Sequence, residues 1–204
     1  PVVLSIISIG AAPALVNAAA CFINVIINTT LYRYGGDNAV GAAGIFTTYA
    51  SLLTTIVLGI CQGMQPIVGY NYGAGSVGRL RRVYLIAVGV STLITAIGSL
   101  VGTCFPESVA AMFTTDTLLQ QNTVRALSLS MMAFSVVGFQ IITTAFFQSI
   151  GKASQSIFLS LTRQVLFLIP LLLVMPDRFG LDGVWLAFPS SDIIATAVAL
   201  LMVV

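Results

Sequence analysis

The sequence predicts an all-α membrane protein with six transmembrane helices, and three observations support this fold class. Hydrophobic residues make up 58% of the 204 residues and charged residues only 7%, whereas soluble domains carry about a quarter charged residues. Apolar stretches long enough to cross a bilayer recur along the chain, separated by segments that contain glycine, proline or charged residues. Lysine and arginine gather in alternate connecting segments, as the cytoplasmic loops of multi-pass proteins do.

The first half of the chain holds three of the expected spans. Residues 8–32 contain no charged side chain, and the glycine pair Gly35-Gly36 that follows indicates a turn. Residues 39–70 are rich in glycine, alanine and serine, which allow helices to pack closely within lipid. The third span covers residues 83–105, and Pro106 ends it.

The second half holds three more spans, at about residues 124–150, 156–175 and 183–204. The fourth is preceded by a polar, mildly amphipathic segment, Glu107–Gln121, which we expect to lie at the membrane surface. Asp116 is the expected N-cap of the helix that follows this segment.

The stretch Gly59–Arg82 fixes the orientation of the spans. Pro66 favours a kink, the glycines after it permit a tight turn, and three arginines close the stretch. Arginine and lysine collect in cytoplasmic loops. The cations on this expected cytoplasmic side are Arg79, Arg81, Arg82, Lys152 and Arg163. The acids on the opposite side are Asp37, Glu107, Asp116, Asp177 and Asp182. Arg33, Arg125 and Arg178 are the exceptions, since they fall on the side of the acids. The pattern places both ends of the chain in the cytoplasm.

Several classes of function lack the residues they need. There is no histidine, which excludes a Ser-His-Asp triad and most zinc sites. Cys21, Cys61 and Cys104 form no CxxC pair, so we interpret them as small packing residues. The glycine-rich turn lacks the GK[ST] signature of a phosphate loop. An enzyme is therefore not expected, and a net charge of +2 gives no indication of nucleic-acid binding.

Polar amides inside the spans are the first candidate functional residues. Asn17, Asn24 and Asn28 follow one another at intervals of seven and four, which places them on one helical face. Gln140 and Gln148 interrupt the apolar surface of the fourth span. Such amides either hydrogen-bond between helices or contact a substrate in a water-filled cavity, and both interpretations stay open.

Two charged residues also fall inside spans. Only 13 residues between Arg163 and Asp177 lack charge, too few to cross about 30 Å at about 1.5 Å per residue. The fifth helix must therefore carry Arg163 about two turns into the membrane. There it either extends to the headgroups or faces a polar cavity. Asp192 is the only carboxylate expected within a span, in its outer half.

Three motifs, in this order, resemble the multidrug and toxin extrusion (MATE) family. They are GMQPIVGYNYGAG followed by RLRR, FFQSIGKASQSIFLSLTRQ, and GLDGVWLAFPSSD, which begin at Gly63, Phe146 and Gly180. The resemblance covers essentially the whole chain and is greatest to the MepA-type multidrug export proteins. It implies twelve helices in two six-helix lobes, of which this chain would form helices seven to twelve. The N-terminal lobe would be the partner of this lobe, and both chain ends look cut.

The same resemblance implies a function. Family members in the cytoplasmic membrane export organic cations and other amphipathic drugs in exchange for sodium ions or protons. The carboxylates that some members place on the seventh and tenth helices correspond here to Cys21 and Val137. The resemblance therefore implies a coupling-ion site in the N-terminal lobe, and no other cofactor.

The drug-facing wall of this lobe is expected to combine amides with aromatic and flexible apolar side chains. Its candidates are Asn17, Asn24, Asn28, Gln140, Gln148, Phe139, Phe146 and Met132. The candidates for gate or structural roles are Gln62, Gln65, Arg163 and Asp192. Two alternatives remain: a lipid-linked oligosaccharide flippase of the same superfamily, and a half-transporter fragment that does not transport.

Overall fold

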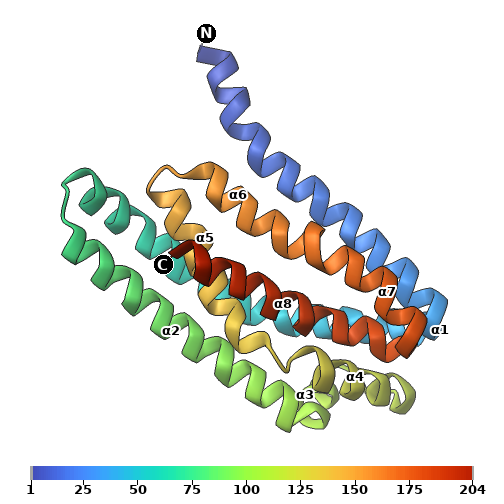
Figure 1. The fold of residues 1–204 in the computed structure, drawn as a ribbon. Coiled ribbons are helices and arrows are strands. Elements are labelled where there is room, and N and C mark those ends of the chain that lie inside the picture. The colour runs from blue at the N-terminus through green and yellow to red at the C-terminus, as the bar shows by residue number, and fades with distance from the viewer. Residues whose placement is uncertain (1, 204) are drawn as a thin grey trace.

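Two helices that meet at one glycine form the first part of the fold, and they share the label α1. The computed structural model describes the backbone of residues 2–203 and the side chains of residues 18, 20–152 and 154–202. Helix α1 (Val2–Gly73) is non-helical only at Gly36, with φ 65° and ψ −161°, a conformation that glycine adopts readily. The chain reverses there, so the first arm (residues 2–35) and the second arm (residues 37–73) form a hairpin (Figure 1).

The remaining elements continue the helical chain, and the part described contains no strand. A continuous rod follows α5, because α6, the π-helix η2 and α7 join without a break. The elements are α2 (Val77–Cys104), α3 (Pro106–Phe113), α4 (Thr117–Ser130), the 3₁₀ turn η1 (Phe134–Val136), α5 (Val137–Ser149), α6 (Ala153–Leu161), η2 (Thr162–Leu168), α7 (Ile169–Phe179) and α8 (Leu181–Val203).

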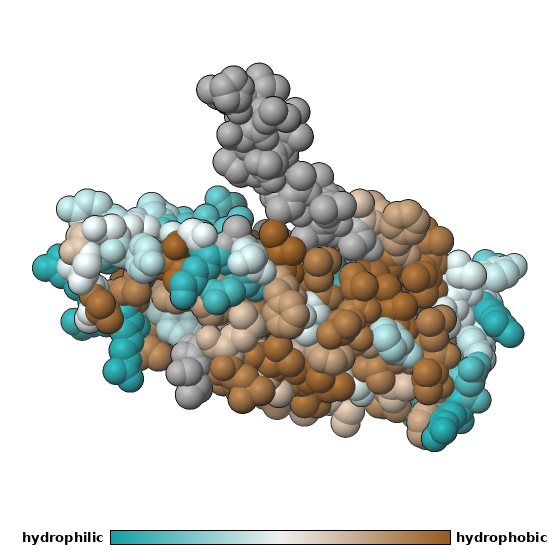
Figure 2. Space-filling view, turned by 45° about the horizontal axis from the view of Figure 1, so that its top comes forward, coloured by the Kyte–Doolittle hydropathy of each residue, from teal (hydrophilic) through white to brown (hydrophobic). Residues whose placement is uncertain are grey.

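The helices are long and apolar enough to cross a membrane. Four described stretches meet this condition: Ala20–Gly73, Val77–Cys104, Ser154–Phe179 and Leu181–Met202. A fifth is added when α4 and η1–α5 are taken together as one bent span. Gly36 divides the first stretch into two arms, and the predicted fold class, an all-α membrane protein, is confirmed. Figure 2 shows the consequence, a hydrophobic band between two hydrophilic ends.

Contacts between the turns confirm which of them share an end of the molecule. The Tyr34 hydroxyl donates to Asp177 Oδ1 at 2.6 Å, and this joins the Gly36 bend to the end of α7. Arg125 Nε and Nη2 donate to the Asp182 carboxylate at 3.0 and 2.7 Å, which joins α4 to the start of α8. The turns α1–α2 and α5–α6 lie at the other end (Figure 1).

The structure corrects some of the expected boundaries. The fourth span, expected to be continuous over 124–150, is broken between α4 and α5 by a bend of 58°. The turn expected at 176–182 is shorter, because α7 runs through Pro176 to Phe179 and only Gly180 separates it from α8. The expected cap is confirmed, since Asp116 Oδ1 accepts from the Leu118 and Leu119 amides at 2.8 and 3.1 Å.

Hydroxyl groups on α2 stabilise the break between α4 and α5. A broken helix leaves carbonyl groups without their usual amide partners, and within a membrane these groups need another donor. Ser99 Oγ donates to the Met131 carbonyl at 2.5 Å, and Thr95 Oγ1 donates to the Ser135 carbonyl at 2.9 Å. The bend is therefore fixed by the neighbouring helix.

Replacing Ser99 with alanine should lower the free energy of unfolding by about 0.5–1.5 kcal/mol, because the Met131 carbonyl loses one of its two donors and keeps only the Phe134 amide at 3.1 Å. Thr103→Val is the matched control, since the Thr103 hydroxyl bonds only within α2, to the Ser99 carbonyl. Thermal unfolding in detergent measures both variants. Equal melting temperatures for the two would show that Ser99 does not hold the break.

Helices α2 and α5 approach each other closely at a glycine. Gly138 is buried, and a Cβ added to it would lie 2.5 Å from the Ser91 carbonyl oxygen and 2.7 Å from Thr95 Oγ1. Small residues at such crossings are typical of helices that pack within lipid. Farther along α2, the Tyr49 hydroxyl donates to the Gly98 carbonyl at 2.8 Å and ties α2 to the second arm of α1.

Candidate functional site

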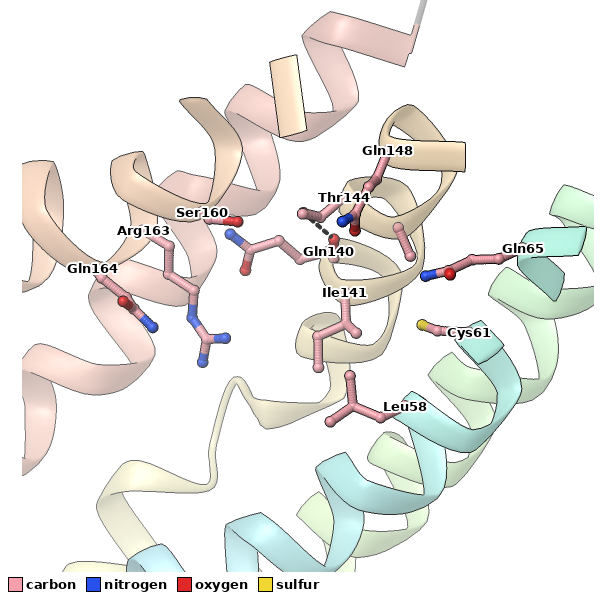
Figure 3. A pocket seen from close by; sticks show the side chains of 11 residues that line it. Leu58, Cys61, Gln65, Gln140, Ile141, Thr144, Gln148, Ser160, Arg163 and Gln164 are labelled. Atoms are coloured by element: carbon pink, nitrogen blue, oxygen red, sulfur yellow. Dashed lines mark hydrogen bonds between the residues drawn. The ribbon is translucent and has the colours of Figure 1, made fainter. Parts of the chain in front are cut away.

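Two neighbouring pockets between the helices share Arg163 and Gln164. The first, here called the glutamine pocket, has a volume of about 250 Å³ and lies between the second arm of α1, α5 and the α6–η2 rod (Figure 3). The second, here called the aspartate pocket, has a volume of about 200 Å³ and lies between both arms of α1, η2 and α8. The glutamine pocket is lined by Leu58, Cys61, Gln65, Gln140, Ile141, Thr144, Ala145, Gln148, Ser160, Arg163 and Gln164.

Gln140 is the most unusual residue of the glutamine pocket. Its side chain is only 3% exposed, and no described group donates to its Oε1 atom. Gln164 Oε1 is also buried without a partner among the described residues. Buried polar atoms nearly always have hydrogen-bond partners, and an exception requires an explanation. Two unpaired amide oxygens therefore belong to residues that line one pocket.

Arg163 and Asp192 form an ion pair within the helical bundle. Arg163 Nε donates to Asp192 Oδ1 at 2.7 Å, and the side chains are 30% and 5% exposed. Asp192 lies midway along α8 rather than in the outer half of its span. Of the two interpretations open for Arg163, the structure shows the polar cavity, because the guanidinium lines both pockets.

The π-helix η2 provides both shared residues. A π-helix has a wider turn than an α-helix and occurs mostly as a short insertion at functional sites. Here it covers Thr162–Leu168, so Arg163 and Gln164 both belong to the widened turn. Leu168, at the end of η2, lines the aspartate pocket as well. The local backbone therefore places neighbouring residues toward the interior.

Several predicted site residues come together in these pockets. Gln65, Gln140, Gln148 and Arg163 line the glutamine pocket. Asn24 and Asp192 line the aspartate pocket together with Arg163. The gate candidate Gln65 thus shares a pocket with two of the drug-facing candidates.

Other predicted residues lie elsewhere. Asn28 and Gln62 are exposed and line neither pocket, and the Asn17 side chain lies outside the described residues. Met132 is 62% exposed beside the α4–α5 break. The aromatic candidates pack against other side chains, Phe139 near Phe147 and Leu159, and Phe146 on the Tyr84 ring at 4.7 Å between centroids. Their roles in substrate contact stay predictions.

Sequence reasoning missed Gln164, Thr144 and Ser160 as lining residues. These helices show little periodicity of polar and apolar residues, and Gln164 lies in the π-helix η2, which the sequence does not reveal. The packing role expected for the cysteines holds for Cys61, which is buried and lines the glutamine pocket, whereas Cys21 and Cys104 are exposed.

Among the described side chains, no cluster of three His, Cys, Asp or Glu residues that could bind a metal occurs.

Long apolar helices, packed around pockets that contain a few polar side chains, define a multi-pass membrane protein. The sequence profile of the MatE family matches residues 13–174. The chain therefore belongs to the MatE family, and the membrane-transporter class follows from that membership.

Similar proteins come from sequence and from structure. The multidrug export protein MepA of Staphylococcus aureus (strain NCTC 8325 / PS 47) is 24% identical over 97% of this chain and 43% of its own length. The MepA protein of Staphylococcus saprophyticus is 21% identical over 99% of this chain and 44% of its own. The chain thus spans less than half the length of these relatives.

Solved structures share the fold. The MATE multidrug transporter DinF-BH is 35% identical over 99% of this chain and 45% of its own, with a TM-score of 0.84. A MOP superfamily transporter from Pyrococcus furiosus has a TM-score of 0.88 at 22% identity, over 97% of this chain and 45% of its own. The arrangement of helices described above is therefore that of MATE transporters.

Proposed function

We propose that this chain forms the C-terminal lobe of a multidrug exporter that expels organic cations and other amphipathic drugs in exchange for sodium ions or protons. The glutamine pocket is the observation that carries this proposal. It combines apolar walls at Leu58, Ile141 and Ala145 with unpaired amide oxygens at Gln140 and Gln164. Pockets of this composition suit amphipathic ligands, which need apolar contact and a few polar groups.

The coupling ion is proposed to bind in an N-terminal lobe. Asp192 is the only acid in the described pocket linings given above, and Arg163 already occupies it at 2.7 Å. An arginine this close opposes the binding of a second cation. The positions that correspond to carboxylates in some relatives hold Cys21 and Val137 here, which supports the same assignment.

The proposed location is the cytoplasmic membrane, with both ends of this chain in the cytoplasm. The end of the molecule that holds the α1–α2 turn carries Arg79, Arg81 and Arg82, and the α5–α6 turn there adds Lys152. The distribution of arginine and lysine supports this orientation. The N-terminal lobe of the same transporter is the proposed protein partner, and the lipid bilayer surrounds both.

The two alternatives make different predictions. A lipid-linked oligosaccharide flippase must bind a pyrophosphate, and Arg163 is the only cation in the described linings of the two pockets. Deleting the gene would then impair cell-wall precursor export rather than drug efflux. A half-transporter fragment would show no transport at all, even when purified material contains every associated chain. Membership in a family of transporters supports transport rather than catalysis.

The proposal is tested with the complete gene product reconstituted in vesicles. A fluorescent organic cation is loaded inside, and its exit is followed under an imposed sodium gradient and, separately, under a proton gradient. Gradient-dependent exit under either condition is expected. Failure to move any of a panel of organic cations under both gradients would overturn the proposal.

Replacing Gln140 with leucine should raise KM for dye export about three- to tenfold, because the pocket loses a hydrogen-bonding side chain of similar size. The folded protein should not be destabilised, since the unpaired Oε1 atom is removed with the amide. Gln62→Leu is the matched control, an exposed glutamine outside both pockets. An unchanged KM in Gln140→Leu would remove Gln140 from the substrate site.

A further inference from the structure

Arg163 uses only part of its hydrogen-bonding capacity. A guanidinium carries five N–H donors in a planar fork. Nε donates to Asp192, while no described residue accepts a hydrogen bond from Nη1 or Nη2. The side chain is 30% exposed through the two pockets that it lines. The terminal nitrogens are therefore available to an acceptor that the described residues do not supply.

The glutamine pocket itself offers no competing acid. Its described lining contains one cation, Arg163, and neither aspartate nor glutamate. Asp192 is buried on the other side of the guanidinium and holds it through Nε. This contact orients the fork in advance, and a pre-oriented arginine binds a carboxylate with less loss of side-chain freedom. Asp192 thus acts as a positioning residue for Arg163.

The amide groups complete the recognition pattern. Gln140 extends from α5 toward η2, and Arg163 extends from η2 into the same space (Figure 3). The unpaired Oε1 atoms of Gln140 and Gln164 accept hydrogen bonds, so they suit an N–H group on the ligand. The volume of about 250 Å³ is below the range of about 300–1,000 Å³ that complete drug-sized ligands occupy. A pocket of this volume has room for one end of a larger molecule.

We propose that the glutamine pocket binds the carboxylate-bearing end of an amphipathic organic acid or zwitterion, with the carboxylate on Nη1 and Nη2 of Arg163 and an N–H group on the amide oxygens of Gln140 and Gln164. A single guanidinium balances one negative charge, so a monovalent carboxylate suits it better than a pyrophosphate. This inference rests on the proposed function and narrows its substrate class, from amphipathic drugs in general to those with an acidic group.

A pair of dyes isolates the carboxylate. A rhodamine ethyl ester and the corresponding free acid share one cationic ring system and differ only in whether the carboxyl group is blocked. Binding of each dye to the purified complete transporter is followed by fluorescence polarisation. The free acid is expected to bind about tenfold more tightly than the ester, because it gains an ionic hydrogen-bonded pair. This comparison needs no variant and so does not depend on the folding of one.

Variants then assign the preference to Arg163. The double variant Arg163→Gln with Asp192→Asn removes both charges together and leaves no unpaired buried carboxylate. It should bind acid and ester with equal affinity, because the guanidinium that distinguishes them is gone. Arg178→Gln is the control, because Arg178 is exposed and lies outside both pockets, and it should keep the tenfold preference.

The outcomes separate this inference from the proposed function. Equal binding of the two dyes by the wild type, or a preference for the acid that survives in the double variant, would overturn the carboxylate site and leave multidrug binding standing. Binding of neither dye would also overturn the carboxylate site, whereas the proposed function is overturned only by the transport test with the panel of organic cations. A preference for the acid that only the double variant loses would establish the site.

Discussion

Replacing Arg163 with alanine is expected to lower the free energy of unfolding by about 3–5 kcal/mol, because the change leaves a charged carboxylate buried without a partner. Asp192 is 5% exposed and its described ionic partner is Arg163, at 2.7 Å. The loss should be accompanied by lower yields of folded protein in detergent. Unfolding monitored by tryptophan fluorescence is a direct measurement, since the single tryptophan, Trp185, is buried in α8, the helix that carries Asp192.

The reverse substitution should be milder. Asp192→Asn leaves the guanidinium in place, but its terminal nitrogens already reach the pockets, where water can solvate them. Replacing both residues with leucine should recover most of the stability, as exchange of a buried ion pair for apolar side chains often does. A single Arg163→Ala variant as stable as the wild type would show that the pair has no structural role.

Gly138→Ala should destabilise the protein by about 2–3 kcal/mol, since the added methyl group meets backbone rather than a flexible side chain. The new Cβ would lie 2.5 Å from the Ser91 carbonyl oxygen. Helices α2 and α5 must then separate, and the hydrogen bond from Thr95 to the Ser135 carbonyl at the adjacent break should weaken. Thermal unfolding and the yield of monodisperse protein measure the effect.

Gly89→Ala, on the facing helix α2, is the matched control. No atom lies within 4 Å of a Cβ added at Gly89, and alanine is favoured over glycine in a helix by about 0.5–1 kcal/mol. This variant should be as stable as the wild type or slightly more so. If Gly138→Ala behaves in the same way, the close approach of α2 and α5 is not required.

Composition and charge predicted most of the fold. The six passes follow from apolar stretches that a soluble protein could not cover, and the grouping of turns follows from the distribution of charge. The break between α4 and α5 could not be predicted in the same way. No proline occurs between Ser130 and Val137, and two carbonyls at the break accept hydrogen bonds from Ser99 and Thr95 on another helix. Such a bend depends on tertiary contacts rather than on local sequence.

The candidate site was predicted in part for a similar reason. Gln140, Gln148 and Arg163 stand out because polar residues are costly in a membrane and usually have a function. Asn28 and Gln62 stand out equally in the sequence, yet they line neither pocket. Whether such a residue lines a pocket or faces away from it depends on how its helix is rotated about its axis. A helix that is apolar on all sides gives little periodicity from which to read that rotation.

The π-helix η2 also constrains how this segment can vary in length. Successive residues of an α-helix are turned by about 100° around its axis, and a π-turn absorbs one extra residue within an otherwise helical rod. Loss of one residue within Thr162–Leu168 would let α6 and α7 join as a regular helix. The side chains of α6 would then be rotated about the helix axis relative to those of α7. If α7 kept its contacts with α8, Arg163 could no longer reach Asp192. Related proteins with this ion pair should therefore have the same number of residues between α6 and α7, and a deletion there should be accompanied by loss of both charges.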